Sequence, residues 1–308
     1  MDRRIDFIRF HDISCSADSI VLPLKEFCKL KNYNKIQLQY VCLIYSLTYC
    51  VASTIVIMNK MDEFFEDPYK FWEENKEYLV FQSDRRWVKF NNLFCSSFFD
   101  FMEKKIFDYL ECKIEIDVFE FVNLVEGVKY FGRFSAFLFL EIYCCLFDKV
   151  CINNKLDWKK GLTVTSGILN VMGEDCKADL WDKSHNVEID VCLFDKYANG
   201  LLDDVSFGKS LPVLETNLCA YRKLFKKSRY VGYYSDRVLE ECLRVFGHYN
   251  QYDEDLKLIF KSREIVIDSR FLGEKNNWFG VRKELKKFYI KYGRWDWWNM
   301  DYFNGGLF

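Results

Sequence analysis

Apolar residues recur at three- and four-residue intervals along most of the chain, which is the spacing of helices with one buried face. Residues 114–122 instead alternate apolar and charged positions, which fits either a short strand or the start of a helix, and residues 258–267 have some strand character. Residues 273–277, with Gly273 followed by polar residues, predict a turn. Helices are predicted over residues 24–34, 38–58, 61–78 with an interruption at Pro68, 88–108, 137–147, 162–171 and 235–246, and a basic amphipathic helix over 278–292.

Composition supports a mostly helical chain. The 308 residues contain only 3 prolines and 14 glycines, and 50% of them are apolar. Few helix breakers favour long helices over a many-stranded sandwich, and the high apolar content argues against disorder. We therefore expect a mostly α fold: a single helical domain over residues 1–308 with two lobes, for which 1–125 and 126–308 are the candidate boundaries.

One long segment and the cysteines bear on the cellular compartment. Residues 36–59 carry no charge and could in principle cross a bilayer, but they include Gln37, Gln39 and several hydroxyl side chains, so a buried core helix is the preferred interpretation. The cysteine count, 13, is odd, and no secretory signal is recognisable at the N-terminus. We expect a reduced, cytoplasmic protein that does not enter a membrane.

The first candidate site lies at the start of the predicted helix 137–147. Gly132 and Arg133 stand where the backbone N–H groups of a helix lack partners and its dipole is positive, which suits a phosphate or a DNA backbone. The pattern is similar to the hairpin of helix-hairpin-helix DNA-binding proteins. The alternative is a tight turn between helices, with Gly132 chosen for a left-handed conformation.

Three basic segments add candidates for anion binding. Residues 83–89 hold Arg85, Arg86 and Lys89 beside Trp87, an arrangement that suits phosphate recognition, although a capped helix start with solvated basic residues explains it equally. Residues 155–167 combine Asp157 and three lysines with several hydroxyl side chains, which suits either an anion site or a polar loop. Basic and tyrosine residues alternate over 221–237, as in a nucleic-acid groove or a solvated helix. The candidates for DNA binding there are Arg222, Lys226, Lys227, Arg229 and Tyr230. The three histidines, in contrast, lack the spacing of metal ligands.

Several of these segments together resemble a known family. The residues on which the resemblance rests are Phe71-Trp72, Phe81-Gln-Ser-Asp-Arg-Arg-Trp-Val-Lys89, Phe131-Gly-Arg-Phe-Ser-Ala136 with Glu141, Leu156-Asp157 and Thr165-Ser-Gly167. In order and spacing they are similar to the phage amino acid:DNA transferases, also called α-glutamyl/putrescinyl thymine pyrophosphorylases. The resemblance covers residues 40 to 175, about half the chain, with weaker support from 232–241. Tyr130 departs from the pattern, because a Gly-x-Gly hairpin would have its first glycine there.

The resemblance implies both a fold and a reaction. The fold would be helical and related to helix-hairpin-helix DNA glycosylases. The substrate would be double-stranded DNA in which 5-hydroxymethyluracil has been activated as a pyrophosphate ester by a separate DNA kinase. The amine of an amino acid or a polyamine would displace the pyrophosphate and leave a hypermodified thymine.

The resemblance also implies roles for particular residues. Arg85, Arg86, Lys89 and Arg133 would hold the departing pyrophosphate, with Mg²⁺ as a candidate helper ion. Asp157 or Glu141 would accept the proton of the amine, and Trp87 or Tyr130 would stack on a base flipped out of the duplex. Arg237 or Lys160 would hold the carboxylate of an amino acid. The remaining members of the expected substrate-binding set are Asp84, Gly132 and Ser166.

Two rival functions remain open. A non-catalytic helical DNA-binding protein of a phage would use the same hairpin and basic segments. A membrane-attached or structural phage protein would be built around residues 36–59.

Overall fold

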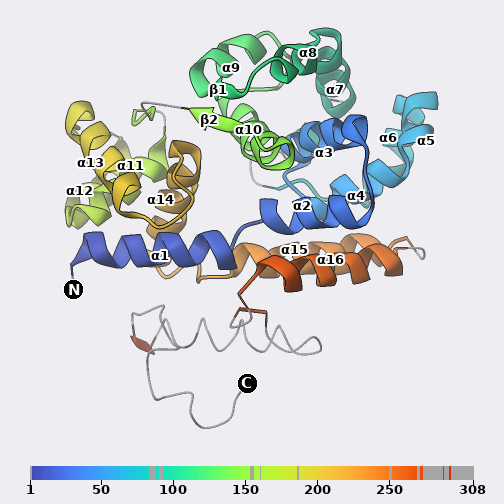
Figure 1. The fold of residues 1–308 in the computed structure, drawn as a ribbon. Coiled ribbons are helices and arrows are strands. Elements are labelled where there is room, and N and C mark those ends of the chain that lie inside the picture. The colour runs from blue at the N-terminus through green and yellow to red at the C-terminus, as the bar shows by residue number, and fades with distance from the viewer. Residues whose placement is uncertain are drawn as a thin grey trace. The chain divides into compact units, whose positions relative to one another are not determined.

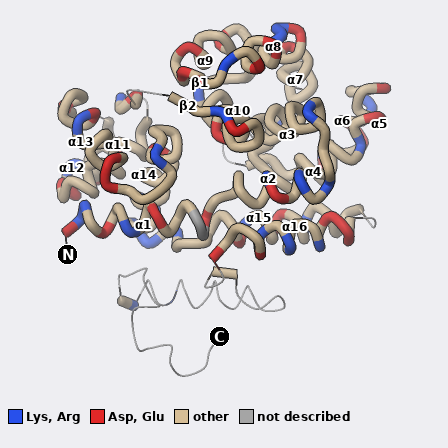
Figure 2. Tube along the Cα trace, viewed as in Figure 1, with Lys and Arg blue, Asp and Glu red and all other residues tan. Residues whose placement is uncertain are grey.

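The computed structural model is mostly helical. It describes residues 2–82, 88–89, 93–152, 156–159, 161–185, 187–249, 252–268, 271–272, 287 and 291–292. Over these residues it contains the helices α1 to α16 and one sheet of two short strands (Figure 1). Acidic and basic residues are scattered along helices that consist mostly of uncharged residues (Figure 2). The expected mostly α fold is therefore confirmed, while the predicted turn at 273–277 and most of the predicted helix 278–292 lie outside the described residues.

The chain forms two compact units, each assembled from segments that are distant in sequence. Unit 1 comprises residues 1–19, 153–236 and 267–308, and unit 2 comprises residues 20–152 and 237–266. The candidate lobes 1–125 and 126–308 were contiguous, and the units do not follow that boundary. The division falls inside α15 (Tyr233–Phe246).

Unit 1 is built on a helix pair that α1 covers. Helix α11 packs against α12 and α14, while α1 contacts α11, α13 and α14. The bounds are α1 Arg3–Ala17, α11 Leu162–Val171, α12 Asp175–Ser184, α13 Val191–Asp204 and α14 Leu211–Phe225. Phe7 and Phe10 of α1 each lie 5.3 Å from the ring of Tyr221 on α14. Aromatic burial of this kind supplies much of the packing energy in a small unit.

In unit 2, α10 occupies the centre and contacts α2, α3 and α9 (Figure 1). Helix α3 also packs on α4 and α7, and α16 packs on α2. Strands β1 and β2 pair in parallel, with Ile116 opposite Cys151. The bounds are α2 Val21–Leu30, α3 Lys35–Thr48, α4 Val51–Asn59, α5 Met61–Glu66, α6 Pro68–Asn75, α7 Leu93–Glu103, α8 Ile106–Glu111, β1 Glu115–Asp117, α9 Val118–Val125, α10 Arg133–Phe147, β2 Val150–Ile152 and α16 Asp253–Val266.

The uncharged segment 36–59 forms two buried helices rather than one. Tyr49 adopts a left-handed conformation (φ 50°) and ends α3. The Thr54 hydroxyl donates to the carbonyl of Cys50 (2.8 Å), and the Cys50 N–H donates to the Thr48 hydroxyl (3.2 Å), so polar side chains satisfy the backbone at the break. Among the described residues, no helix combines the length and the apolar character that a membrane span requires.

Other boundaries differ from the prediction for local reasons. The predicted helix 88–108 is interrupted where Lys105 adopts φ 51°, between α7 and α8. Residues 114–122 contain both expected structures, since β1 runs directly into α9. The strand character of 258–267 is wrong, because this run belongs to α16, whose first turn is acidic and matches the helix dipole. Pro68 begins α6 as its first residue, which confirms the interruption there.

Substitution of Gly167 should destabilise unit 1. A Cβ atom at this position of α11 would lie 2.3 Å from the backbone oxygen of Leu218 on α14, so one helix would have to move. We expect Gly167→Ala to cost about 1–3 kcal/mol in the free energy of unfolding, measured by urea denaturation. Gly132→Ala is the control, since a Cβ atom there meets nothing within 4 Å. A Gly167→Ala protein as stable as this control would contradict the close α11–α14 packing.

Candidate functional site

A buried carboxylate on α15 organises one polar cluster of unit 2. Arg237 Nε donates to Glu241 Oε1 at 2.8 Å, one helical turn away, and Gln82 Nε2 donates to the same oxygen. Glu241 is only 8% exposed. Burial raises the pKa of Glu241, although the guanidinium of Arg237 opposes this change. The carboxylate is therefore held in place and is easier to protonate than one in water.

Two tyrosines near the end of α3 and one phenylalanine of α10 lie beside this ion pair. The ring of Tyr49 is 5.9 Å from that of Tyr45 and 5.7 Å from that of Phe134, both in edge-on geometry. The guanidinium carbon of Arg237 lies 5.9 Å from the centre of the Tyr49 ring. The left-handed Tyr49 and the hydrogen bond from Gln82 N–H to the Thr48 carbonyl (3.0 Å) fix these positions.

Glu141 joins the cluster from α10. Burial, and then the negative charges of Glu141 and Glu241, raise the pKa of Tyr45, while the charge of Arg237 lowers it. Carboxylates from two different helices thus act on one buried tyrosine. We call Tyr45, Tyr49, Glu141, Arg237 and Glu241 the Tyr45 cluster.

The Tyr45 cluster combines carboxylates with aromatic rings. Arg237 pairs with Glu241, and the negative charges of Glu141 and Glu241 both raise the pKa of Tyr45. Carboxylates and aromatic faces together attract an ammonium group, and a carboxylate can accept its proton. Within the described ranges, no group of three or more His, Cys, Asp or Glu side chains is arranged to hold a metal ion.

The connection from α9 to α10 forms a helical hairpin that α7 holds in place. The Lys129 N–H donates to Asp100 (2.6 Å), and the Ser97 hydroxyl donates to the Lys129 carbonyl (2.6 Å). The left-handed residue of this turn is Tyr130 (φ 59°, 42% exposed), so a non-glycine residue takes the conformation for which a hairpin glycine was expected. Gly132 has φ −81°, so the left-handed alternative for Gly132 is wrong.

The cationic residues expected around the leaving group are placed only in part. Arg133 begins α10, and its guanidinium carbon lies 4.5 Å from the centre of the Phe137 ring. Lys89 is half-buried, and desolvation lowers its pKa. Both belong to unit 2. Asp84, Arg85, Arg86 and Lys160 lie outside the described residues, so a shared anion pocket remains a prediction.

The two carboxylates expected to accept a proton belong to different units. Glu141 is in unit 2 and Asp157 is in unit 1. Asp157 lies just before α11, and its backbone carbonyl accepts the Gly161 N–H at 2.8 Å. Only Glu141 lies in a cluster that also contains another expected site residue, Arg237.

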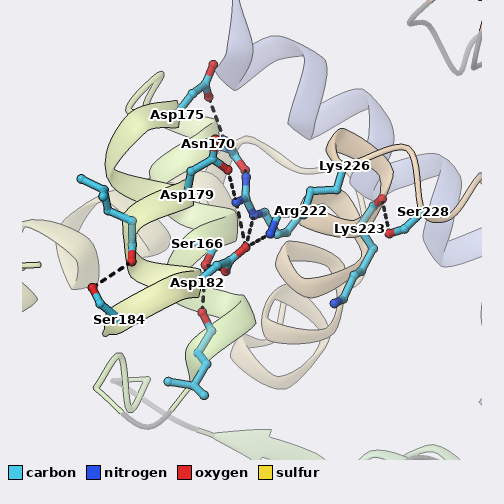
Figure 3. Close-up of polar contacts among 12 residues, drawn as sticks. Ser166, Asn170, Asp175, Asp179, Asp182, Ser184, Arg222, Lys223, Lys226 and Ser228 are labelled. Atoms are coloured by element: carbon cyan, nitrogen blue, oxygen red, sulfur yellow. Dashed lines mark hydrogen bonds and ion pairs between the residues drawn. The ribbon is translucent and has the colours of Figure 1, made fainter. Parts of the chain in front are cut away.

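Arg222, expected to bind DNA, is instead part of the interior of unit 1. Its side chain is 1% exposed. The guanidinium donates to Asn170 (2.7 Å), Asp179 (2.6 Å) and Asp182 (2.8 Å), which come from α11 and α12 (Figure 3). A buried guanidinium whose donors are used in this way joins three helices and is not available to a phosphate. Arg222 therefore lies inside unit 1 and not on an exposed basic face, which the expected contact with DNA would require.

Asp182 also accepts hydrogen bonds from two other residues that were expected to bind substrate or DNA. The Ser166 hydroxyl and the Lys226 ammonium both donate to its carboxylate (Figure 3). Burial alone would raise the pKa of Asp182, but hydrogen bonds from Lys226, Ser166 and Arg222 lower it to about 2. Ser166 is fully buried. It therefore stabilises the packing of α11 against α12 and does not contact substrate.

The rest of the basic segment also makes internal contacts. The guanidinium carbon of Arg229 lies 4.7 Å from the Tyr234 ring centre, and Arg229 donates to the Tyr234 hydroxyl. Tyr230 is buried and donates to Asp236 at 2.8 Å, so it cannot stack on an exposed base. Lys227 remains exposed. The segment thus fits the alternative of tyrosines packed inward on a basic helix end.

The sequence analysis did not select Tyr45, Tyr49 or Glu241. Two signals were present in the sequence. Tyr45 and Tyr49 are four residues apart within an uncharged segment, and the oppositely charged Arg237 and Glu241 are four residues apart on a predicted helix.

Comparison of the chain with protein-family models, curated proteins and solved structures finds no match.

Replacement of Arg222 should lower the stability of the protein, because the side chain is buried and paired inside unit 1. Arg222→Ala would leave the Asp182 carboxylate without its buried partner, which we expect to cost about 3 kcal/mol in the free energy of unfolding, measured by denaturant titration. Lys227→Ala, at an exposed site of the same segment, should stay within about 0.5 kcal/mol of the unmodified protein. An Arg222→Ala protein of normal stability that had lost DNA affinity would restore the original interpretation.

The low pKa of Asp182 predicts an acid-sensitive contribution to stability. The pKa is about 2 in the folded protein against an ordinary 3.8, so the folded state releases this proton more readily. The contribution is complete above pH 4 and is lost as the pH falls towards 2. Asp182→Asn should therefore lower stability at neutral pH and flatten its loss between pH 4 and 2, measured by circular dichroism. If the variant lost stability between pH 4 and 2 as steeply as the unmodified protein, other carboxylates would control the acid unfolding.

Proposed function

We propose that the protein is a DNA base-hypermodifying transferase and that the Tyr45 cluster of unit 2 receives the amine. The proposal is supported by one arrangement: Arg237 pairs with Glu241 beside the rings of Tyr45 and Tyr49, and the charges of Glu141 and Glu241 raise the pKa of the buried Tyr45. An amine donor is a cation until it loses a proton, and this cluster offers carboxylates to attract it and to accept that proton.

The reaction forms one carbon–nitrogen bond and breaks one carbon–oxygen bond. The neutral amine attacks the exocyclic methylene of the activated 5-hydroxymethyluracil. Pyrophosphate leaves with the electron pair of the carbon–oxygen bond, and the proton of the new ammonium passes to Glu141. We assign this step to Glu141, the carboxylate that the resemblance already names as a proton acceptor. The donor is an amino acid or a polyamine, and a separate DNA kinase supplies the activated base.

Cationic groups of unit 2 would stabilise the departing pyrophosphate. Arg133 at the start of α10 and Lys89 are the described candidates, and Arg85 and Arg86 complete the proposed set. Pyrophosphate leaves with several negative charges, so donors positioned in advance lower the barrier most. The proposed setting is the cytoplasm of the host cell of a phage.

Exchange of Glu141 tests the proposal. The substrate is duplex DNA that carries the pyrophosphate ester of 5-hydroxymethyluracil, and mixed amino acids and polyamines serve as donors. Loss of a general base lowers rates by about 10²–10⁴-fold, so Glu141→Gln should slow pyrophosphate release at least about 100-fold. Glu126→Gln, at an exposed position before the hairpin turn, is the matched control. Nucleoside mass spectrometry identifies the product.

Two outcomes would oppose the proposal. Transfer at an unchanged rate in Glu141→Gln would remove the carboxylate from the reaction. Absence of pyrophosphate release from the unmodified protein with every donor would remove the transferase.

A non-catalytic DNA-binding protein is the second candidate, and the hairpin favours it. Lys104, Lys105 and Lys129 are exposed around the turn that presents Tyr130. A simple binder would hold modified and unmodified duplexes equally well, with affinity that falls steeply as salt rises. Glutamine at the three lysines would then abolish binding, while Glu141→Gln would leave it unchanged.

A further inference from the structure

Two cysteines of unit 2 meet where the chain turns from α10 into β2. Cys144 is in the last turn of α10, which ends at Phe147. Asp148 adopts φ 51°, and the Lys149 N–H donates back to the Cys144 carbonyl at 3.0 Å, so the chain reverses sharply. Cys151 follows in β2 opposite Ile116 of β1. The reversal and the strand pairing together bring the second cysteine back to the helix end.

The side chains of the two cysteines interact. A hydrogen bond with Cys151, together with burial, raises the pKa of Cys144 well above its usual range. Both side chains are half-buried, so a small reagent can reach them while the strand pairing keeps them together.

We propose that Cys144 and Cys151 form a reversible disulfide that fastens the end of α10 to β2. The reversal of the chain at Asp148 and the pairing of β2 with β1 hold the two cysteines close together, so little movement is needed to join them. In a reducing cell, such a bond forms transiently and reports on the redox state. The proposal does not depend on the proposed transferase function.

Glutathione disulfide is a sufficient oxidant. The thiolate of one cysteine attacks one of its sulfurs and releases one glutathione thiolate. The thiol of the other cysteine then loses its proton to solvent and attacks the protein sulfur of the mixed disulfide, which releases the second glutathione. Two protein thiols are oxidised, and one glutathione disulfide is reduced to two glutathione molecules.

Peptide mapping of the full-length native protein tests the assignment. After treatment with glutathione disulfide, the remaining thiols are alkylated and the protein is digested with trypsin, which cuts after Lys149 and so separates the two cysteines. We expect one linked pair, residues 134–149 joined to 150–155, that disappears on reduction with dithiothreitol. Oxidation should also raise the thermal midpoint by several degrees, since a closed loop restricts the unfolded chain.

Neighbouring cysteines supply the controls. Cys145 lies in the same peptide as Cys144, so Cys145→Ser should keep the link and the thermal shift, whereas Cys144→Ser should lose both. Exposed Cys112 and Cys176 should gain glutathione instead. The proposal is overturned if Cys144 and Cys151 are alkylated while these exposed sites are oxidised, or if Cys144→Ser keeps the link through Cys145.

Discussion

A charged side chain buried among helices must be paired, and this constraint decides the contacts of Arg222 and Arg237. Arg222 uses its guanidinium to join α11, α12 and α14 through Asn170, Asp179 and Asp182. Arg237 and Glu241 meet the same demand in unit 2. Removing a charged side chain from water costs several kcal/mol, and hydrogen-bonded partners of opposite charge offset this cost. Basic residues that look like a binding patch in the sequence therefore become internal connections once the helices pack.

Helical periodicity predicted the helices well and their ends less well. Residues 162–171 match α11 because apolar spacing and a preceding glycine mark the same limits. Helix breaks at Tyr49 and Lys105 were not predictable, since each depends on a left-handed conformation that non-glycine residues adopt only when the surrounding packing requires it. Tyr130 shows the same effect, because contacts from Asp100 and Ser97 to Lys129 hold the turn that a glycine was expected to supply.

The sequence identified residues of the candidate site by the chemistry of single side chains, and it could not show which partners those side chains contact. Glu141 and Arg237 were selected as isolated groups, and the structure places them around one tyrosine. Ser166, Arg222 and Tyr230 were selected in the same way, but each is buried and donates to a carboxylate. One sequence does not show which carboxylate will lie opposite Ser166 or Arg222, because their shared partner, Asp182, is 16 and 40 residues away in the chain.

The proposed reaction also constrains where a leaving group could sit. A carboxylate that accepts the proton of the amine would repel a pyrophosphate held beside it. The proposed anion pocket would therefore be displaced from the proposed amine site. Helix α10 provides such a displacement, because Arg133 and Glu141 are eight residues apart, or about 12 Å along the axis. A displacement reaction needs the amine and the leaving group on opposite sides of the reacting carbon. One rigid helix that carries a cation at its start and a carboxylate two turns later would hold them apart without relying on a loop.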